Sequence, residues 1–553
     1  MSLLEDAKAF KAKVKARGSK NGKDKKEPKK PRFKFQNRLK HSESHWWAIE
    51  NASKSLKPQI IYLKLIRWLH EQGFYKHKLN EFDAIIVFVQ DNVVFERSVT
   101  QLWEYIFDYL ENLPEGIECV ANPDNEDART VVELHRDKLI EMAYRTINRY
   151  LGKDAGWHYL PTLAANWVTD NRVYCYKFYQ NCFVKVSKKG IDPKPYTELP
   201  GHIWDNQKLT RDFELLPNDE IEQLFGAYAT DQYSKPINSK YNFADYFKKI
   251  GSQDADFFEA LQTIVGYLLH DFFESKPKAI MLTDRISMGG PSGRTGKGLL
   301  LTAVSKITNM TRINGKDFKE SDNFKYQFAN HNTKVIALDD ISKKFNFEQR
   351  FNDISEGIQV NQKGLKAYTI RAKMVITTNK TLEGESTSHK DRRTDFALAN
   401  YFSNPENFSW LDGKTFGVGE YYNEWFFADW SPTQWQYFDN FMICCIARYM
   451  EVGKPIQVED PMLKYRQLVD ATAEEFVDFM DLSFKDETYK VGSKIEYDKK
   501  AIKNDFKEKY DDYNNEKMNQ RKFNKWLDTY IKYKAFKVKE RKTNGKYHIE
   551  FLE

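Results

Sequence analysis

The chain has 553 residues, of which 41% are hydrophobic and 15% aromatic, so a wholly disordered protein is excluded. At about 150 residues per domain, this length predicts three or four domains. No apolar run approaches the roughly 18 residues of a membrane helix, and the N-terminus lacks a signal-peptide core. The five cysteines are scattered without a CxxC pair, which argues against a disulfide framework and a structural zinc site. We therefore expect a cytoplasmic protein without a membrane partner.

The net charge of +7 is unevenly distributed. Residues 1–40 contain 15 Lys/Arg against 4 Asp/Glu, whereas the rest of the chain contains 71 against 75. A basic end of this kind is typical of proteins that bind a polyanion, usually nucleic acid, although it also fits a solubilising tail without a partner. Because this segment is poor in apolar residues and rich in Lys, Gly and Pro, we predict a disordered basic tail over 1–40.

Residues 41–235 predict an α/β N-terminal domain whose role the residues do not reveal. Hydrophobic periodicity favours helices over 56–73 and 131–151, a strand over 82–89, and a strand pair over 172–186 that turns at 180–181. Farther along, 242–273 is helical with a break at Gly251, and short β-branched runs then alternate with helices. That alternation is typical of a parallel α/β sheet. We place this second domain at 236–405.

A glycine-rich loop stands between the predicted strand 279–283 and the predicted helix 299–307. Such a loop can hold phosphate, because its N–H groups point inward and the helix N-terminus adds positive potential. Lys297 would reach the β- and γ-phosphates of ATP. The alternative is a flexible loop without a ligand. The candidate nucleotide-binding residues are Gly290, Gly293, Arg294, Thr295, Gly296, Lys297 and Gly298.

The loop departs from the Walker A pattern at two positions. The pattern has Gly where this chain has Pro291, and Ser or Thr where it has Gly298. The missing hydroxyl normally binds Mg²⁺, so one ligand of the expected magnesium ion is unassigned. Water or Thr295 is the candidate substitute.

Polar residues follow the next two predicted strands. Strand 334–338 runs into Asp339 and Asp340, and strand 373–378 runs into Asn379. Asp339 would hold Mg²⁺, Asp340 would orient the attacking water, and Asn379 would sense the γ-phosphate. Guanidinium groups suited to a developing phosphate charge come next. The candidate catalytic residues are Lys297, Asp339, Asp340, Asn379, Arg392 and Arg393.

The order and spacing of these motifs resemble superfamily 3 helicases. Residues 354–360 and 378–379 look like the B′ and C motif region of that family, and 394–396 is also similar. The phage and plasmid primase-helicase group, with its poxvirus type, is the nearest match. The resemblance implies an AAA+-like P-loop ATPase core in a ring, commonly a hexamer, that moves 3′-to-5′ on single-stranded DNA. It leaves room for a separate primase or replication protein as a partner.

A hairpin is predicted between 357–360 and 365–371, with its tip at 361–364. Gly364 permits a positive φ at the tip. The resemblance implies a hairpin that projects into the ring's pore and grips the strand. Lys363 would meet backbone phosphate, with Lys366 behind it, because lysine contacts phosphates without reading bases. The alternative is an ordinary solvated turn.

The C-terminal part divides into a helical aromatic segment, 406–455, and a last domain, 456–553. Predicted helices at 498–510 and 516–533 precede a hairpin of 535–540 and 546–551. This is a winged-helix order. Residues 491–553 contain 17 Lys/Arg against 11 Asp/Glu, so DNA binding by Arg521, Lys522 and Lys525 is expected. A winged helix used for protein contacts is the alternative.

The sequence therefore favours an ATP-dependent replicative DNA helicase of a phage, plasmid or similar element. Its fold would be α/β, with a P-loop ATPase core, an α/β N-terminal domain and a C-terminal winged helix. ATP and Mg²⁺ are the expected cofactors, and single-stranded or forked DNA and further copies of the chain are the expected partners. A nucleotide-switched DNA-binding initiator or loader without unwinding activity is the second hypothesis. A structural subunit with an inactive ATP site is the third.

Overall fold

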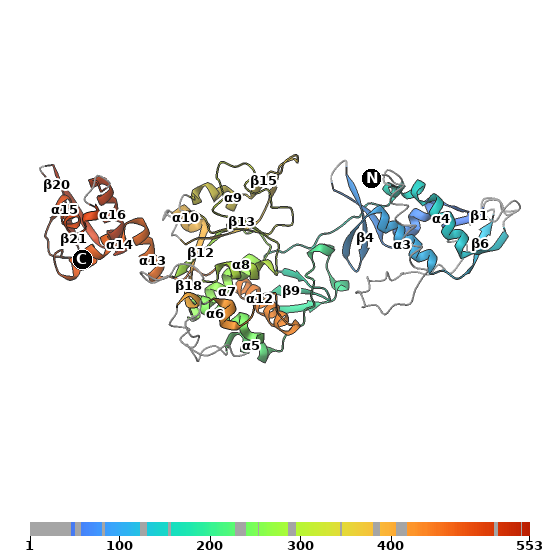
Figure 1. The fold of residues 1–553 in the computed structure, drawn as a ribbon, viewed down its shortest axis with the longest axis horizontal. Helices are drawn as coiled ribbons and strands as arrows, with labels where there is room; N and C mark the ends of the chain where they lie inside the picture. The colour runs from blue at the N-terminus through green and yellow to red at the C-terminus, as the bar shows by residue number, and fades with distance from the viewer. Residues whose placement is uncertain are drawn as a thin grey trace. The chain divides into compact units, whose positions relative to one another are not determined.

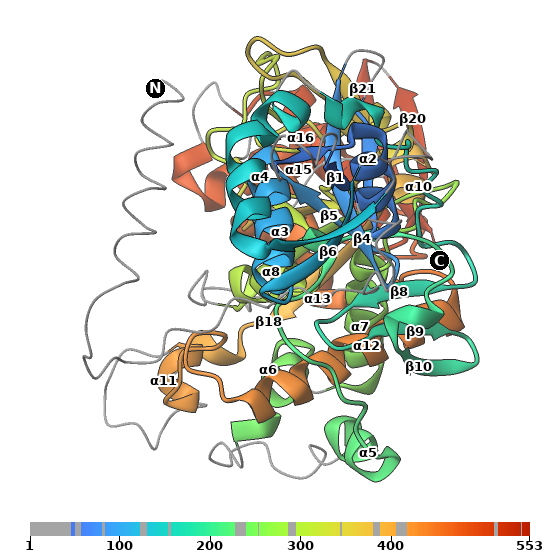
Figure 2. The same ribbon diagram turned by 90° about the vertical axis from the view of Figure 1, so that its right-hand side faces the viewer.

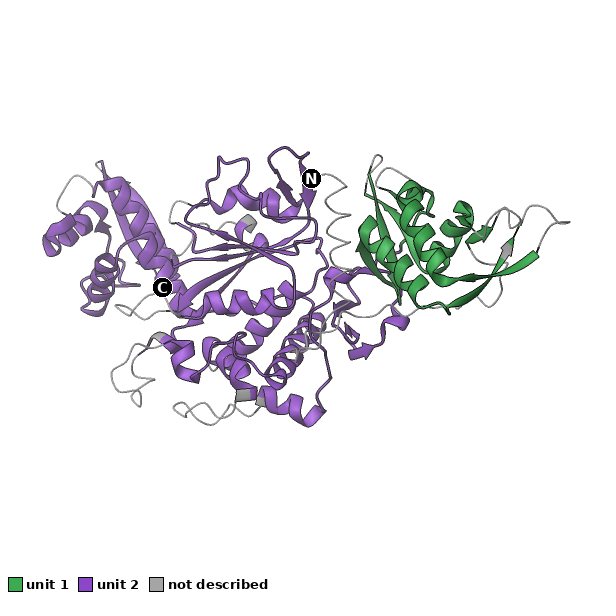
Figure 3. Ribbon diagram, turned by 45° about the vertical axis from the view of Figure 1, so that its right-hand side comes forward, with its two compact units in different colours: residues 1–165 green, residues 166–553 purple. Residues whose placement is uncertain are grey.

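The structure, a computed structural model, falls into two compact units, 1–165 and 166–553 (Figure 3). It describes residues 46–49, 57–79, 83–121, 130–152, 156–226, 239–252, 254–285, 295–342, 345–379, 387–404, 417–513, 518–543 and 545–552. The predicted tail 1–40 lies outside these residues. Within them, no helix is both long and apolar enough to cross a membrane. The mixed α/β class expected from the sequence is confirmed.

The first unit combines a sheet of order β2-β1-β6-β7 with an antiparallel meander of β3, β4 and β5. Its core is rich in aromatic side chains, with Trp46, Trp68 and Tyr105 almost fully buried. The strands are β1 (Trp47–Ile49), β2 (Pro58–Ile60), β3 (Phe74–Lys78), β4 (Ala84–Gln90), β5 (Val93–Arg97), β6 (Gly116–Ala121) and β7 (Thr130–His135). The helices are α2 (Tyr62–Glu71), α3 (Val99–Glu111) and α4 (Arg136–Leu151).

Both helices predicted in this unit begin later than the sequence indicated. The first residues of 56–73 form β2, which pairs antiparallel with β1, and α2 starts at Tyr62. The first residues of 131–151 belong to β7, which pairs with β6 over its whole length, and α4 starts at Arg136. The cause at β7 is the β-branched run Thr130-Val131-Val132, which favours a strand once a partner strand is available. The strand predicted at 82–89 is confirmed as β4.

The second unit begins with a small antiparallel sheet of order β10-β9-β8. Cys175, Val184 and Val186 of this sheet pack in the same core as the helices of the second unit. The predicted 41–235 domain is therefore divided between the two units. The strand pair expected at 172–186 is confirmed. The elements are β8 (Cys175–Phe178), β9 (Phe183–Ser187), β10 (Gly190–Lys194), β11 (Ile203–Trp204) and α5 (Asn218–Gly226).

A five-stranded, all-parallel sheet forms the centre of the second unit, in the order β13-β14-β17-β12-β18. Its inner strands are apolar runs because both faces of the sheet are covered. Ile280 and Leu282 of β12 pack in one hydrophobic core, while Ala279 and Met281 pack in another. The strands are β12 (Ala279–Arg285), β13 (Met310–Asn314), β14 (Val335–Asp339), β17 (Lys373–Thr377) and β18 (Arg393–Ala399).

Helices cover the face of this sheet that carries Ile280 and Leu282, and α7 and α12 lie side by side there (Figures 1 and 2). Gly266 of α7 permits this approach, because a Cβ there would collide with the Cys445 carbonyl of α12. The break predicted at Gly251 separates two helices, as expected. They and their neighbours are α6 (Asn242–Ile250), α7 (Ala255–Leu269), α8 (Lys297–Ser305), α11 (Val418–Tyr422) and α12 (Pro432–Val452).

The second face is covered by a hairpin and two short helices. Ile358, Val360 and Ile370 of the hairpin pack against sheet residues such as Met374. The predicted hairpin is confirmed, with shorter strands than expected. These elements are α9 (Phe351–Ser355), β15 (Ile358–Val360), β16 (Tyr368–Ile370) and α10 (Thr387–Arg392).

The last part of the chain has its own core around Phe476, Phe506 and Trp526. The expected order of two helices and a hairpin is confirmed. The sequence missed two earlier helices, α13 and α14, and a first strand, β19, which completes a sheet of order β19-β21-β20. The elements are α13 (Pro461–Ala471), α14 (Glu474–Lys485), β19 (Tyr497–Asp498), α15 (Lys499–Lys509), α16 (Gln520–Tyr533), β20 (Lys537–Thr543) and β21 (Lys546–Leu552).

Candidate functional site

The candidate site lies at the carboxyl edge of the parallel sheet. Strands β12, β14 and β17 are adjacent and parallel, so their last residues meet at one edge. The residue types that the sequence singled out at these ends are therefore brought together. In open α/β sheets this edge is the usual place for a ligand.

Lys297, the first residue of α8, reaches two strand ends. Its ammonium group donates to Asn379 Oδ1 at 2.6 Å and forms an ion pair with Asp284, at the end of β12. Thr295 is buried, and its hydroxyl also donates to Asp284. Burial lowers the pKa of Lys297, and the nearby charge of Arg466 lowers it further, while Asp284 opposes both effects. Lys297 and Asn379, two of the candidate catalytic residues, thus lie within hydrogen-bond distance of each other, and Asp284 is a partner that the sequence did not indicate.

The chain enters α8 through a left-handed residue. Gly296 has φ of 96°, a conformation that favours glycine. Its carbonyl accepts a hydrogen bond from the Tyr246 hydroxyl at 2.8 Å, and a Cβ at position 296 would lie 2.9 Å from that oxygen. Glycine is therefore required on two grounds. The predicted residues Gly290, Gly293 and Arg294, and the departure at Pro291, lie outside the described residues.

Asp339, the predicted magnesium ligand, has both carboxylate oxygens engaged. Oδ1 accepts from the Thr377 hydroxyl at 2.6 Å, and Oδ2 accepts from Arg312 Nε at 2.9 Å and Nη2 at 2.6 Å. Gly298 adds no hydroxyl, and Thr295 faces Asp284 instead. The described residues therefore do not fit a magnesium ion at Asp339 as they stand.

Asp340 lies beside Asp339 but faces a different cation. Its carboxylate pairs with Lys316 at 2.7 Å, and that contact raises the pKa of the exposed lysine. Its backbone has φ of 58° and is fixed by a hydrogen bond from its N–H to the Thr377 hydroxyl at 2.7 Å. A non-glycine residue at positive φ is uncommon. The turn directs Asp339 and Asp340 to different partners.

Three carboxylates at this edge thus each hold one cation. The pairs are Lys297–Asp284, Arg312–Asp339 and Lys316–Asp340. Each of these three side-chain cations is therefore paired with a carboxylate of the protein. A phosphate-bearing ligand would have to compete with these carboxylates for them.

Helix α13 closes one side of the edge through Arg466. Its Nη1 donates to the Asp284 carbonyl at 2.6 Å, and its Nη2 donates to the Asn379 carbonyl. Nearby, Arg285 pairs with Asp460, the N-cap residue of α13, at 3.2 Å. The strand ends that carry the site are therefore tied to a helix that leads into the C-terminal part of the chain.

Arg392 and Arg393 lie at the opposite end of the sheet. Arg393 begins β18 and pairs in register with Ala279, the first residue of β12. Asp284 lies five positions farther along β12 than Ala279, or about 16 Å away at the usual rise per residue. Neither arginine joins the Lys297 site of its own chain.

These two arginines differ in their surroundings. Arg393 is largely buried and pairs with Asp395 at 3.1 Å. Burial raises the pKa of Asp395, although Arg393 opposes the shift. Arg392 is partly exposed, lies over the Phe351 ring at 4.8 Å and donates to the Ser355 hydroxyl at 3.2 Å. Arg393 is thus held by a carboxylate of its own strand.

The predicted DNA-binding hairpin has an exposed, anchored tip. Lys363 and Lys366 are exposed, and Gly364 has φ of 78°. Asn361 donates to the Asn323 carbonyl at 2.9 Å, and Gln362 donates to the Gln327 carbonyl at 3.0 Å. The segment that accepts these bonds exposes two aromatic rings, Phe324 at 42% and Phe328 at 72%. The sequence did not single out these rings.

A basic face covers the C-terminal helix α16 and strand β20. Phe523, Trp526 and Leu527 are buried on the inner side of α16, which leaves the outer side to polar residues. The exposed cations of α16 are Arg521, Lys522 and Lys525, which the sequence proposed as DNA contacts, and Lys532; those of β20 are Lys537, Lys539, Arg541 and Lys542.

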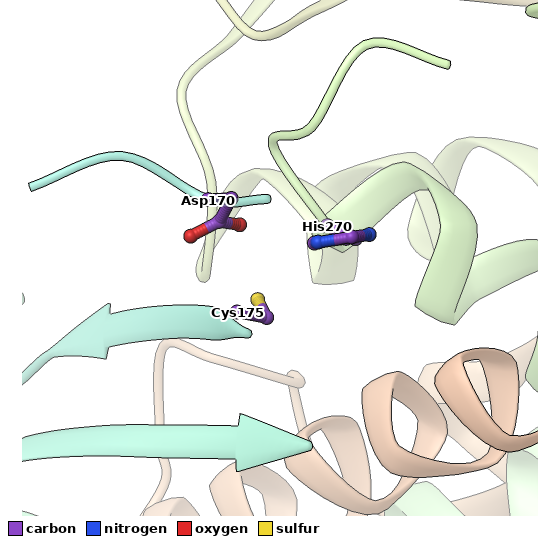
Figure 4. A group of neighbouring side chains, drawn as sticks. All are labelled: Asp170, Cys175 and His270. Carbon is purple, nitrogen blue, oxygen red and sulfur yellow. The ribbon is translucent and has the colours of Figure 1, made fainter. Parts of the chain in front are cut away.

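A second polar cluster contains Asp170, Cys175 and His270, whose ligand atoms lie within 4.8 Å of one another (Figure 4). Both Asp170 oxygens accept backbone N–H groups at 2.8 Å, and His270 Nε2 lies 2.9 Å from the Asn171 carbonyl. Burial raises the pKa of the Cys175 thiol well above its usual value. Two lysines, Lys177 and Lys373, add positive charge to the surroundings. The cluster thus joins β8 to the end of α7 without the character of a cation site.

Residues 288–393 match the model of a family of unknown function, DUF5906. No curated protein matches the chain. Similar solved structures include apo forms of the C-terminal region of NrS-1. One has a TM-score of 0.35 at 12% identity and covers 89% of this chain and 99% of that one. Another has a TM-score of 0.33 at 13% identity and covers 88% and 98%.

Proposed function

We propose that this chain is an ATP-driven DNA helicase with an AAA+-like P-loop core of the superfamily 3 type. The observation that carries the proposal is the meeting of Lys297, Asn379 and the Asp339-Asp340 pair at one edge of a parallel sheet. This edge also receives the N-terminus of α8, where aligned N–H groups favour anionic ligands. A triphosphate fits that combination.

Each of these side chains has a role in ATP hydrolysis. Lys297 would exchange Asp284 for the β- and γ-phosphates and neutralise charge that develops in the transition state. Once its ion pair with Lys316 opens, Asp340 would orient the attacking water and accept a proton from it. Asn379, within hydrogen-bond reach of Lys297, would hold the γ-phosphate or that water.

DNA would be held by the hairpin and by the C-terminal basic face. Lys363 and Lys366 suit phosphate contacts, and the exposed rings of Phe324 and Phe328 suit stacking on unpaired bases. Arg521, Lys522 and Lys525 would contact single-stranded or forked DNA beside the ring. Several copies of the chain, six in this proposal, would form a ring that moves along single-stranded DNA in the 3′-to-5′ direction.

A position for Arg392 far from its own Lys297 supports a ring. An arginine that acts on a nucleotide from that end of the sheet must act on a nucleotide of a neighbouring subunit. The proposal therefore places each ATP between two copies of the chain.

Strand displacement is the decisive test. The full chain should release the labelled strand of a duplex with a 3′ single-stranded tail when ATP and Mg²⁺ are supplied. A duplex with a 5′ tail should be released far more slowly. The Lys297→Ala variant is the matched control, because it removes one ammonium group and leaves the DNA-binding residues intact. No displacement by the parent chain under any nucleotide condition would reject helicase activity.

The second candidate is a nucleotide-switched DNA-binding initiator or loader. The engagement of Asp339 by Arg312, together with Gly298, favours it because this arrangement suits binding better than fast turnover. ATP-dependent DNA binding without strand displacement would support this candidate. Hydrolysis stimulated by single-stranded DNA would exclude a purely structural subunit.

A further inference from the structure

Two departures from the usual phosphate site coincide at the first turn of α8. Position 298 has no side chain, and the carboxylate of Asp339 is held by a guanidinium group. We propose that Arg312 is a phosphate-binding residue of this site, which links Asp339 to the nucleotide in place of a divalent ion held by that carboxylate. This inference rests on the proposed nucleotide site and deepens it.

The geometry places Arg312 between the carboxylate and the start of α8. Its Nε and Nη2 bind Asp339 Oδ2 at 2.9 and 2.6 Å. A Cβ added to Gly298 would lie 3.1 Å from the same Nη2. A serine or threonine at 298 would therefore crowd the guanidinium. The missing hydroxyl and the arginine are complementary features of one site.

The backbone fixes where the arginine can reach. Arg312 lies in β13 and pairs in register with Ala337 of the neighbouring strand β14, two residues before Asp339. Its side chain extends toward the carboxyl edge and is 43% exposed, so a ligand can approach it. The adjacent cation Lys316 faces Asp340 instead. Arg312 alone among the described cations contacts Asp339.

The chemistry of the guanidinium suits this role. Arginine has five N–H donors in a planar fork and stays charged at any physiological pH. Two of those donors bind Asp339, which leaves others for phosphate oxygens. A metal ion would make the same link between a carboxylate and a phosphate with a larger charge. A site built on Arg312 should therefore hold nucleotide without a metal.

The experiment measures binding of N-methylanthraniloyl-ATP to the full chain by fluorescence, in excess Mg²⁺ and in excess EDTA. The parent chain should bind with Kd values within about threefold of each other, because Arg312 supplies the local charge. Arg312→Ala should weaken binding in EDTA by about tenfold or more, as expected for loss of hydrogen bonds to a charged group. Arg312→Lys keeps the charge without the fork and should recover only part of the loss.

Two further variants complete the test. Arg145→Ala removes an exposed arginine of α4 in the first unit and should bind like the parent. Gly298→Ser combined with Arg312→Ala restores the hydroxyl, so its binding should become dependent on Mg²⁺. Thermal unfolding of each variant checks that the fold is retained.

Two results would overturn the role of Arg312: a loss of more than about tenfold by the parent chain in EDTA, or unchanged EDTA binding by Arg312→Ala. Absence of binding by the parent chain in both conditions would overturn the nucleotide site itself, and the role of Arg312 with it.

Discussion

At the scale of single residues, Lys297 has the most direct consequence for chemistry. Its ammonium is positioned by Asp284 and Asn379 at the edge where phosphates would bind. Lys297→Ala should lower kcat for ATP hydrolysis by at least about 100-fold, the usual cost of removing a charge-stabilising donor. A phosphate-release assay measures this. Lys189→Ala, at an exposed turn between β9 and β10, is the charge-matched control, and an equal rate in both variants would contradict the assignment.

His270 predicts a pH dependence of stability. Burial lowers its pKa from 6.5 to about 4, and the charges of Lys373 and Lys177 add to the effect, while the Asn171 carbonyl and Asp271 oppose it. The unfolded chain therefore takes up a proton near pH 6.5 that the folded chain accepts only near pH 4. The free energy of unfolding should fall by about 1.5 kcal/mol between pH 6.5 and 5 from this group alone.

Urea unfolding at the two pH values measures this difference. His270→Gln removes the titrating group and retains a side chain that can donate to the Asn171 carbonyl. That variant should lose less stability over the same pH range than the parent chain does. Identical losses in parent and variant would mean that His270 does not titrate in this way.

The residues that sequence could identify share one property: each directly follows an apolar strand or a glycine-rich turn. Lys297, Asp339, Asp340 and Asn379 belong to this group, and the structure brings them to one edge. Asp284, Arg312 and Arg466 could not be found in this way. Arg466 reaches its Asp284 partner across 182 positions of the chain, so only the packing of α13 brings it there.

At the scale of elements, the proposal gives the hairpin of β15 and β16 a role in DNA binding rather than in ATP binding. Its tip is exposed, while Ile358 and Ile370 fix its base in the core. Lys363→Ala should leave basal ATPase activity intact, abolish its stimulation by single-stranded DNA and abolish unwinding, because a phosphate contact is lost at the tip. ATPase assays with and without DNA and the strand-displacement assay measure these effects.

A stacking variant sharpens the hairpin test. Phe328→Ala removes a ring that is 72% exposed and should weaken single-stranded DNA binding without changing its dependence on salt. Lys363→Ala should instead reduce that salt dependence. Normal unwinding by Lys363→Ala would contradict the role of the hairpin.

Some strands could be predicted from hydrophobic periodicity in the sequence, and others could not. Three strands of the parallel sheet, β12, β14 and β17, were predictable because they are apolar runs that end at polar or turn residues, whereas β13 and β18 were not predicted. Strand β7 was mistaken for the start of α4, since Val131 and Val132 fit either pattern until β6 is present as a partner. Strand β19 has only two residues and exists because β21 pairs with it.

At the scale of the whole molecule, the position of Arg392 predicts that ATP hydrolysis needs two copies of the chain. Arg392→Ala and Lys297→Ala should each be inactive alone. Mixing the two should restore part of the hydrolysis rate, because one interface can combine an intact Lys297 with an intact Arg392. Phosphate release over a series of mixing ratios measures this, with co-purification of two tagged variants as proof of assembly.

Arg393 supplies a matched comparison. Because it is buried against Asp395, Arg393→Ala should act within its own chain and lower the temperature of unfolding. No recovery by mixed Arg392→Ala and Lys297→Ala subunits that assemble would mean that the site is complete within one chain.

Helix α13 connects the edge of the sheet that carries the proposed nucleotide site to the C-terminal part of the chain. Arg466 attaches this helix to the ends of β12 and β17, and the ring of Tyr465 lies 6.3 Å from that of Tyr533 on α16. Only Thr472 and Ala473 separate α13 from α14. Because Arg466 holds α13 to both strand ends and only two residues join α13 to α14, a shift of the strand ends by about an ångström would also move α13. In the proposed function, the basic face of α16 would then change position each time nucleotide binds to or leaves the edge of the sheet.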